Sequence, residues 1–295
     1  MSKLAIVIPY YKIEFFNQCL KSLNNQSNKN FTVYIGDDFS DKDPSDIINL
    51  YNNTLSIKYT RFSNNLGHQF LTKQWDRCID LTENEEWIML LGDDDMISEN
   101  LVEDFYENLN EINENNYQLL RANVTEINDV GETLRSFKYP RTEKAAESYI
   151  KKITQNYHIS LPEYIFRKKS YEKYGFKHFP FAFGSDNVAW LEFSEGKDIY
   201  TLPHAWCIIR TSELSISGNS RNINEKIYAM YLTKKYIINN LFNEFIPIQK
   251  TVIISEAYQN LLFYNKKLYK ERFTFVLKNM KYLTLSQSYN FFFKL

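Results

Sequence analysis

The chain has 295 residues, of which 44% are hydrophobic, 16% aromatic and 24% charged, and its formal net charge is -1. This composition excludes an intrinsically disordered chain, because it supplies enough apolar surface for a packed interior. It also argues against a membrane-spanning helix, because no run approaches the roughly eighteen uncharged apolar residues that a bilayer requires. The N-terminal residues lead into a strand-like run and not into a signal peptide, so we expect a cytoplasmic protein.

The first 115 residues alternate between strand and helix patterns. Apolar, β-branched runs of the kind buried in parallel sheets predict strands at 4–8, 31–35, 57–61 and 87–91. Apolar residues recur at helical spacing in 16–23, 44–51, 70–79 and 98–112, where Ser98 stands at the N-cap position of the last helix. Four strand–helix units therefore precede residue 115.

The pattern changes after residue 115. Residues 119–127 and 133–139, separated by a turn at 129–131, predict antiparallel pairing, and 159–166 predicts a further strand. Residues 221–295 are mainly helical in pattern. The sequence therefore predicts a mixed α/β sheet followed by a helical extension. Cys19, Cys78 and Cys207 lie far apart among apolar neighbours, so we expect them to be reduced core residues.

Polar residues follow three of the predicted strands, as Pro9-Tyr10-Tyr11, Asp37-Asp38-x-Ser40-Asp41 and Asp93-Asp94-Asp95. Ligands bind beyond the carboxyl ends of strands in open parallel sheets. The second segment is also compatible with an Asx turn and helix N-cap, and the third with acids at a helix entry. Three consecutive carboxylates, however, raise one another's pKa unless a cation compensates, and their oxygens suit Mg²⁺ or Mn²⁺. Such an ion would let a nucleotide diphosphate approach them.

Four segments together carry a family resemblance: Ile8-Pro9-Tyr10-Tyr11, Asp37-Asp38-x-Ser40-Asp41, Asn65-x-Gly67 and Leu91-Gly92-Asp93-Asp94-Asp95. In this order and spacing, they resemble family 2 glycosyltransferases over roughly residues 3–217. The resemblance implies a GT-A fold, which is a Rossmann-like, mixed and mainly parallel sheet flanked by helices. Residues 1–220 would form the catalytic domain, with a nucleotide-binding half (1–115) and an acceptor-binding half (116–220), and residues 221–295 a basic, aromatic helical extension.

The resemblance also implies roles for individual residues. Tyr10 and Asp38 would contact the nucleotide base, and Asp94, assisted by Asp95, would ligate the divalent metal. The donor-binding set that it implies is Pro9, Tyr10, Asp37, Asp38, Asn65, Gly67 and Asp93. Many relatives read Leu-Asp-x-Asp-Asp where this chain has Gly92 in place of the first aspartate, which leaves open which pair forms the DXD motif of the family.

The second half contains the candidate general base. Phe183-Gly184-Ser185-Asp186 and the apolar residues that follow resemble the family's base-carrying segment, with Ser185 in place of a common acidic residue. Asp186 is therefore the candidate, and an N-cap role is its alternative. Arg210, before Ser215-Ile216-Ser217, resembles the end of the family's catalytic domains, where a loop closes over donor phosphates; a surface arginine is the alternative.

The implied activity is inverting transfer of a sugar from a nucleotide-diphosphate-sugar, with a UDP-sugar favoured, to a hydroxyl of a glycan or lipid-linked glycan. It would proceed by metal-assisted single displacement, as in bacterial surface-polysaccharide biosynthesis. A sugar-phosphate nucleotidylyltransferase is the alternative enzyme, but it should carry a glycine-rich phosphate loop, and Pro9-Tyr10-Tyr11-Lys12 has no glycine. A non-catalytic nucleotide-sugar-binding protein is the other alternative, against which the aspartates and Asp186 argue.

Charge divides unevenly along the chain. From residue 221 onward there are twelve Lys or Arg and four Glu, a balance of about +8, so the first 220 residues carry about -9. Helices packed on the catalytic domain with solvated basic faces would explain the tail. A sharper hypothesis is peripheral contact with the anionic inner leaflet of the cell membrane. Nucleic-acid binding is not expected, because no recognised motif accompanies the basic residues.

Overall fold

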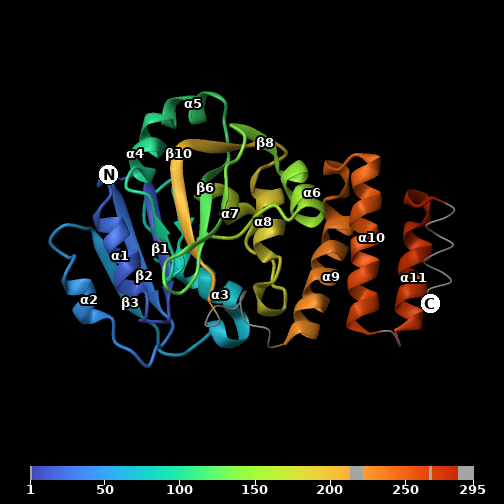
Figure 1. The fold of residues 1–295 in the computed structure, drawn as a ribbon, viewed down its shortest axis with the longest axis horizontal. Helices are drawn as coiled ribbons and strands as arrows, with labels where there is room; N and C mark the ends of the chain where they lie inside the picture. Colours follow the sequence, from blue (N-terminus) through green and yellow to red (C-terminus); the bar gives the residue numbers. More distant parts are fainter. Residues whose placement is uncertain (1, 213–221, 266–267, 285–295) are drawn as a thin grey trace.

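The computed structural model describes residues 2–212, 222–265 and 268–284. A central sheet carries helices on both faces, and a row of three helices, α9 to α11, stands beyond α6 and α8 at one end (Figure 1). The strands in the described residues are β1 Leu4–Tyr10, β2 Phe31–Asp37, β3 Ile57–Arg61, β4 Trp87–Leu90, β5 Met96–Ile97, β6 Leu119–Ile127, β7 Thr133–Phe137, β8 Thr142–Lys144, β9 Tyr164–Arg167 and β10 Asp198–Arg210.

The sheet is mixed, as the sequence predicts. Its order is β3-β2-β1-β4-β9-β6-β10-β5, with β7 paired to β6 and β8 paired to β10. β1, β2, β3 and β4 are parallel, and β9 runs antiparallel to both β4 and β6. Since β6 therefore runs in the same direction as β4, and β10 is parallel to β6, the carboxyl ends of β1, β2, β4, β6 and β10 lie at one edge.

The apolar runs form strands because both faces of the sheet are covered. Leu4 and Ile6 of β1 belong to one core, and Ala5 and Val7 to the other, so alternate residues point to opposite layers. The helices in the described residues are α1 Phe16–Asn24, α2 Ser45–Asn49, α3 Gly67–Ile79, α4 Leu101–Glu107, α5 Leu109–Glu114, α6 Ala145–Gln155, α7 Lys168–Tyr174, α8 Ser185–Phe193, α9 Ile223–Asn240, α10 Pro247–Tyr264 and α11 Tyr269–Asn279, with short 3₁₀ turns η1 Pro180–Ala182, η2 Phe242–Glu244 and η3 Met280–Tyr282.

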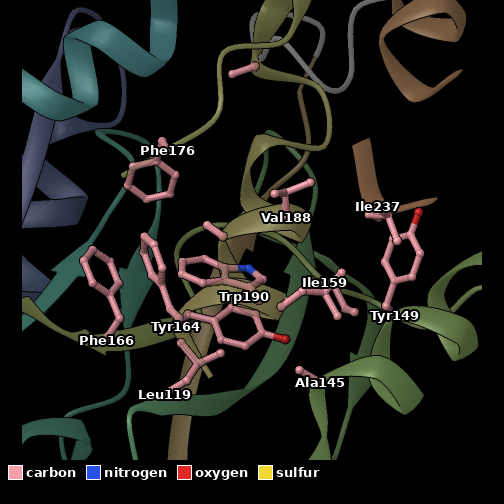
Figure 2. Close-up of a cluster of buried hydrophobic side chains, with 14 of the residues drawn as sticks. Leu119, Ala145, Tyr149, Ile159, Tyr164, Phe166, Phe176, Val188, Trp190 and Ile237 are labelled. Carbon is pink, nitrogen blue, oxygen red and sulfur yellow. The ribbon is translucent and has the colours of Figure 1, made fainter. Parts of the chain in front are cut away.

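Each face of the sheet has its own helices. Helices α1, α2, α4 and α5 contribute to the core that contains Leu4, whereas α3, α6, α8, α9, α10 and α11 contribute to the core that contains Ala5. The second core is rich in aromatic rings, with Tyr164 stacked on Trp190 at 4.5 Å between centroids and Phe166 and Phe176 beside them (Figure 2). Cys19, Cys78 and Cys207 are buried and form no disulfide, as expected.

Two predicted elements differ from the structure. The helix expected over 98–112 is two helices that meet at Asn108. The first of them begins after Asn100, and Ser98 is not its N-cap, because the Ser98 Oγ accepts the N–H of Trp206 at 2.9 Å. The strand expected at 159–166 starts only at Tyr164, because Glu163 accepts the N–H of Ser160 at 2.7 Å and closes a turn there.

The predicted helical extension is confirmed over the residues that the structure describes, whereas the expected boundary between 220 and 221 lies outside them. Its helices share the aromatic core, since Ile237 of α9 and Ile253 of α10 belong to the same cluster as Trp190 of α8. Figure 2 shows Ile237 beside Tyr149 of α6. No helix among the described residues combines the length and the apolar character that crossing a bilayer would require.

A buried lysine joins α9 to α10 and makes stability depend on pH. The Nζ of Lys234 donates to the Oδ1 of Asn260 at 2.9 Å, and burial lowers the pKa of Lys234 from 10.5 to about 8. Between these two values the unfolded chain binds the proton more readily than the folded chain does. The free energy of unfolding should therefore rise with pH across this window.

We expect Lys234→Met to stabilise the protein at pH 7, by up to roughly 3 kcal/mol, since a shift of one pKa unit corresponds to about 1.4 kcal/mol. The advantage over the wild type should shrink as the pH approaches 10, because the wild-type lysine then folds uncharged. Urea unfolding at pH 7, 8, 9 and 10 measures the difference, with Lys21→Met, an exposed lysine of α1, as the control. A Lys234→Met advantage that stays constant or grows with pH would contradict this account.

Candidate functional site

The three consecutive aspartates follow β4 and have different partners. Asp93 is buried, and its Oδ2 accepts the main-chain N–H groups of Tyr11 and Lys12 at 2.8 and 2.6 Å. Asp94 is the most accessible of the three, and its Oδ2 lies 3.1 Å from the Nζ of Lys12. Asp95 is buried, and its Oδ1 accepts the N–H of Arg210 at 2.9 Å. Asp93 thus joins β4 to the loop after β1, whereas Asp95 joins it to β10.

The glycine at position 92 leaves room for the carboxylates of Asp94 and Asp95. A Cβ atom at this position would stand 2.5 Å from the Oδ2 of Asp95 and 3.0 Å from the Oδ1 of Asp94. The carbonyl of Gly92 also accepts the N–H of Asp95 at 3.2 Å, so the aspartates turn back over the glycine. A side chain here would force the carboxylates of Asp94 and Asp95 to shift.

The aspartate cluster has the electrostatics of a cation site. Burial and the charge of Asp94 raise the pKa of Asp93 to about 6, and burial raises that of Asp95. Burial alone would lower the pKa of Lys12, but the charges of Asp94 and Asp93 raise it. The ammonium of Lys12 thus already compensates part of the negative charge.

The donor set fits a hard divalent ion. Asp94 offers a carboxylate at the accessible edge of the cluster, and oxygen ligands suit Mg²⁺ or Mn²⁺. Among the residues that the structure describes, no group of three or more His, Cys, Asp and Glu is placed to hold a metal by itself.

Asp37 and Asp38 hold the end of β2 to its neighbours. The Oδ2 of Asp37 accepts from the hydroxyl of Tyr59 at 2.7 Å and from Arg61 at 2.8 Å. Asp38 accepts the N–H of Leu66 at 2.7 Å and that of Gly67 at 2.9 Å, and it pairs with Arg77.

The Asn65-x-Gly67 segment closes onto Asp38. A Cβ atom at Gly67 would lie 2.7 Å from the Oδ2 of Asp38, so the glycine permits this close approach. The Oδ1 of Asn65 accepts the N–H of His68 at 3.0 Å, which supports the first turn of α3. The segment is therefore held at the carboxyl end of β2.

The two tyrosines at the end of β1 correct the predicted contact between Tyr10 and the nucleotide base. Tyr10 is fully buried, its hydroxyl donates to the carbonyl of Lys42 at 2.9 Å, and its ring packs on Phe16. A ring in this position cannot stack on a nucleotide base. Tyr11 and Phe39, at the ends of β1 and β2, are instead 47% and 49% exposed. Pro9 lies next to Gly36 in the β1–β2 pair, inside the sheet.

Arg210 ends β10 and is buried, so the surface alternative is wrong. Its guanidinium lies over the ring of Phe15 at 3.9 Å, donates to Gln18 at 2.6 Å and donates to the carbonyl of Asn128 at 2.9 Å. With its main-chain N–H on Asp95, this arginine joins the aspartate cluster to β10 and to the β6–β7 turn. The segment Ser215-Ile216-Ser217 lies outside the described residues.

Asp186 lies in the first turn of α8, and burial is the main cause that raises its pKa. The N-cap of this helix is Gly184, so the N-cap alternative for Asp186 is wrong. The Oδ1 of Asp186 accepts the N–H and side-chain amide of Asn187, at 2.8 and 2.9 Å. A carboxylate with a raised pKa is a stronger base, which suits proton abstraction near neutral pH.

Polar contacts continue from the carboxyl end of β6. Glu126, near the end of β6, pairs in register with Ile209 beside Arg210, and its Oε1 lies 2.6 Å from the Nδ1 of His158. His158 in turn contacts Ser160 and approaches Glu163, whose charge acts on Asp186. The carboxyl edge of the sheet therefore includes the aspartates, Arg210 of β10 and Glu126 of β6, and the contacts of Glu126 continue to His158.

Helix α9 fixes the turn from which α8 starts. The hydroxyl of Thr233 donates to the carbonyl of Phe183 at 3.1 Å. Gly184 has φ +85°, and a Cβ atom there would stand 2.5 Å from the Oγ1 of Thr233. The hydroxyl of Tyr236 also donates to Glu192 of α8 at 2.7 Å. The extension thus packs directly on the segment that presents Asp186.

We expect Gly184→Ala to destabilise the protein by about 2–4 kcal/mol, because left-handed backbone strain of about 1–2 kcal/mol adds to a steric clash in a packed site. Gly131→Ala is the matched control, since Gly131 has φ +87° and a Cβ atom there would meet nothing within 4 Å. Chemical denaturation of both variants measures the difference between them. An equal loss of stability in the two variants would show that the clash with Thr233 does not contribute to the destabilisation.

Four charged residues of this region were not predicted from the sequence: Lys12, Arg61, Arg77 and Glu163. Arg61 ends β3 beside β2, and Arg77 lies on α3 and reaches Asp38. The signal for Arg61 was its place at the end of a predicted strand next to Asp37. The signal for Arg77 is weaker, because only the packing of α3 on the sheet brings its side chain to Asp38.

The comparisons with known proteins identify the class. A family model described as "Glycosyl transferase family 2" matches residues 5–179. The chain therefore belongs to glycosyltransferase family 2. This assignment excludes the nucleotidylyltransferase alternative. No curated protein sequence matches the chain.

Solved structures share the fold. S. aureus TarS 1-349 in complex with UDP-GlcNAc superimposes with a TM-score of 0.66 and 19% identity, over 98% of this chain and 79% of that chain. The complex of TarS 1-349 with UDP gives a TM-score of 0.63 and 20% identity, over 96% and 76% of the two chains. At this identity the likeness concerns the fold, and the GT-A architecture predicted from the sequence is confirmed.

Proposed function

We propose that the protein is an inverting glycosyltransferase that moves a sugar from a nucleotide-diphosphate-sugar to a hydroxyl of a glycan or lipid-linked glycan. The observation that carries this proposal is the shared edge of the sheet, where the accessible carboxylate of Asp94 and the buried Asp93 and Asp95 stand together. Membership of family 2 supports the reaction class. UDP-bound relatives of similar fold favour a UDP-sugar as donor.

In the proposed reaction, Tyr11 and Phe39 offer exposed rings to the nucleotide base at the ends of β1 and β2. Asp37, Asp38, Asn65, Gly67 and Pro9 shape the wall beside them, and Asp93 holds the loop after β1 in place. Asp94, with Asp95 behind it, would hold Mn²⁺ or Mg²⁺, and such an ion would stabilise the negative charge of the departing diphosphate. Lys12 and Arg210 add positive charge at the same cluster.

Asp186 completes the proposed mechanism as general base. It removes the proton of the acceptor hydroxyl while the hydroxyl oxygen attacks the anomeric carbon from the face opposite the diphosphate. One such displacement inverts the anomeric configuration. No second carboxylate is required as a nucleophile, in contrast to double displacement.

We also propose that the acceptor reaches the enzyme at the inner face of the cell membrane, in the biosynthesis of a surface polysaccharide. The charge balance of about +8 after residue 220 supports attraction to an anionic leaflet. Lipid-linked acceptors would be presented at this surface. The enzyme would then act in the cytoplasm as a peripheral protein.

A thermal-shift screen of nucleoside diphosphates and their sugars, with and without Mn²⁺, tests the donor assignment. Ligand at one hundred times its Kd should stabilise the folded state by about 2.7 kcal/mol. We expect UDP and a UDP-sugar to raise the Tm only when Mn²⁺ or Mg²⁺ is present. A screen in which no nucleotide shifts the Tm with either metal would reject the proposed donor class.

A further inference from the structure

A cavity outside the candidate active site lies between α9 and α11. It has a volume of about 720 Å³, which is within the range of ligand sites. Its buried floor is formed by the rings of Tyr231, Phe242 and Phe275. Tyr231 packs edge-on against Phe275 at 5.9 Å between centroids, which joins the two helices below the cavity.

The rim of this cavity is strongly basic. Lys235, Lys270, Lys278 and Lys281 line it, against the single acid Glu271. Glu271 is already engaged, since its Oε1 accepts from the hydroxyl of Tyr231 at 3.1 Å and lies 3.7 Å from the Nζ of Lys235. Within the described residues, no ion pair joins Lys270, Lys278 or Lys281 to an acid. The rim therefore attracts an anion, and lysine binds phosphate as a compact point charge.

Beside the basic rim, α11 and the turn after it carry an exposed apolar stripe. Phe273, Leu277 and Met280 follow one another at spacings of four and three residues, and are 47%, 49% and 42% exposed. Residues at these spacings share one face of a helix. The lysine rim and the apolar stripe thus occupy neighbouring faces of one short segment.

From this juxtaposition we infer that α11 is the membrane-contacting element, and that the cavity beside it binds the phosphate of an anionic phospholipid headgroup. The stripe of Phe273, Leu277 and Met280 enters the interface between headgroups and acyl chains. Lys270, Lys278 and Lys281 reach the phosphate layer, because their alkyl stems run along apolar surface while the ammonium groups stay in water. The inference rests on the proposed membrane contact and narrows it to one element.

A soluble polyanion is the competing occupant of the cavity. It would use the same lysines, but it would leave the apolar stripe exposed to water. A phospholipid satisfies both features at once, because it carries charge and apolar chain together. The stripe therefore favours the lipid surface.

Vesicle binding by the full chain tests the inference without any transfer assay. We compare wild type with two triple variants, K270Q/K278Q/K281Q at the cavity and K21Q/K138Q/K169Q at exposed positions elsewhere, which remove the same charge. On vesicles that contain phosphatidylglycerol, the cavity variant should lose at least about tenfold in affinity. Each lysine near an anionic surface adds to the electrostatic free energy of binding, and this variant removes three. The control variant should bind like the wild type, and F273S/L277S should also lose affinity.

Two outcomes on vesicles would overturn the inference. Wild-type affinity in the cavity variant would show that these lysines do not bind the lipid surface. Equal losses in the two triple variants would indicate general charge attraction. Inorganic polyphosphate that binds through the cavity lysines, without any vesicle binding, would assign the cavity to a soluble polyanion. UDP binding and thermal unfolding, measured on the same variants, show that the fold and the donor site are intact. These measurements separate failure of this inference from failure of the proposed transfer reaction.

Discussion

Asp186→Asn should slow sugar transfer by about 10²–10⁴-fold, which is the usual contribution of a general base. The amide keeps the shape of the side chain but cannot take the proton of the acceptor hydroxyl. Donor binding should be unchanged, because the aspartate cluster lies on other elements. Steady-state kinetics with calorimetric measurement of donor affinity would give a loss in kcat with little change in Kd for the donor.

A matched control for this substitution lies within the chain. Asp46 follows Ser45 in the first turn of α2, just as Asp186 follows Ser185 in the first turn of α8. Asp46→Asn removes an exposed acid at the same helix position, and should leave turnover unchanged. Unchanged turnover in Asp186→Asn itself would refute this residue as the base.

The second large effect is expected from Asp94→Ala. Removing the accessible carboxylate should weaken donor binding in the presence of Mn²⁺ by at least the 10–100-fold that residues supporting a metal site typically cost. In EDTA the variant and the wild type should bind the donor with similar weak affinity. Calorimetry with and without Mn²⁺ separates loss of the metal from loss of the nucleotide contacts.

Asp80→Ala provides the control for charge, because Asp80 is an exposed aspartate at the C-terminal end of α3. It should leave both affinities unchanged. If Asp94→Ala weakened donor binding equally with and without Mn²⁺, the carboxylate would act on the donor directly and not through an ion.

The sequence predicted the parallel part of the sheet well, for a physical reason. Strands such as β1 and β4 are buried on both faces, so their apolar runs are unbroken and easy to recognise. β10 was missed because Pro203 and His204 interrupt its apolar pattern, where its register with β6 shifts between Thr201 and Trp206. The local pattern around this irregularity does not reveal a thirteen-residue strand.

The candidate site was predictable where its residues follow strands directly. Asp37, Asp38 and the three aspartates after β4 were found in this way. The environment of Asp186 was not, because α6, α8 and α9 create it together from distant parts of the chain. Tyr10 and Tyr11 could not be distinguished from the sequence, because the pattern does not show which of two adjacent side chains points into the core. The structure separates them, since Tyr10 is buried and Tyr11 is exposed.

The contact between Thr233 and Gly184 bears on where this enzyme can be divided. Thr233 belongs to α9, and α9 also supplies Ile237 to the aromatic core. A protein shortened to residue 220 would lose the side chain that supports the start of α8 and would expose that core to water. The smallest active unit should therefore include α9.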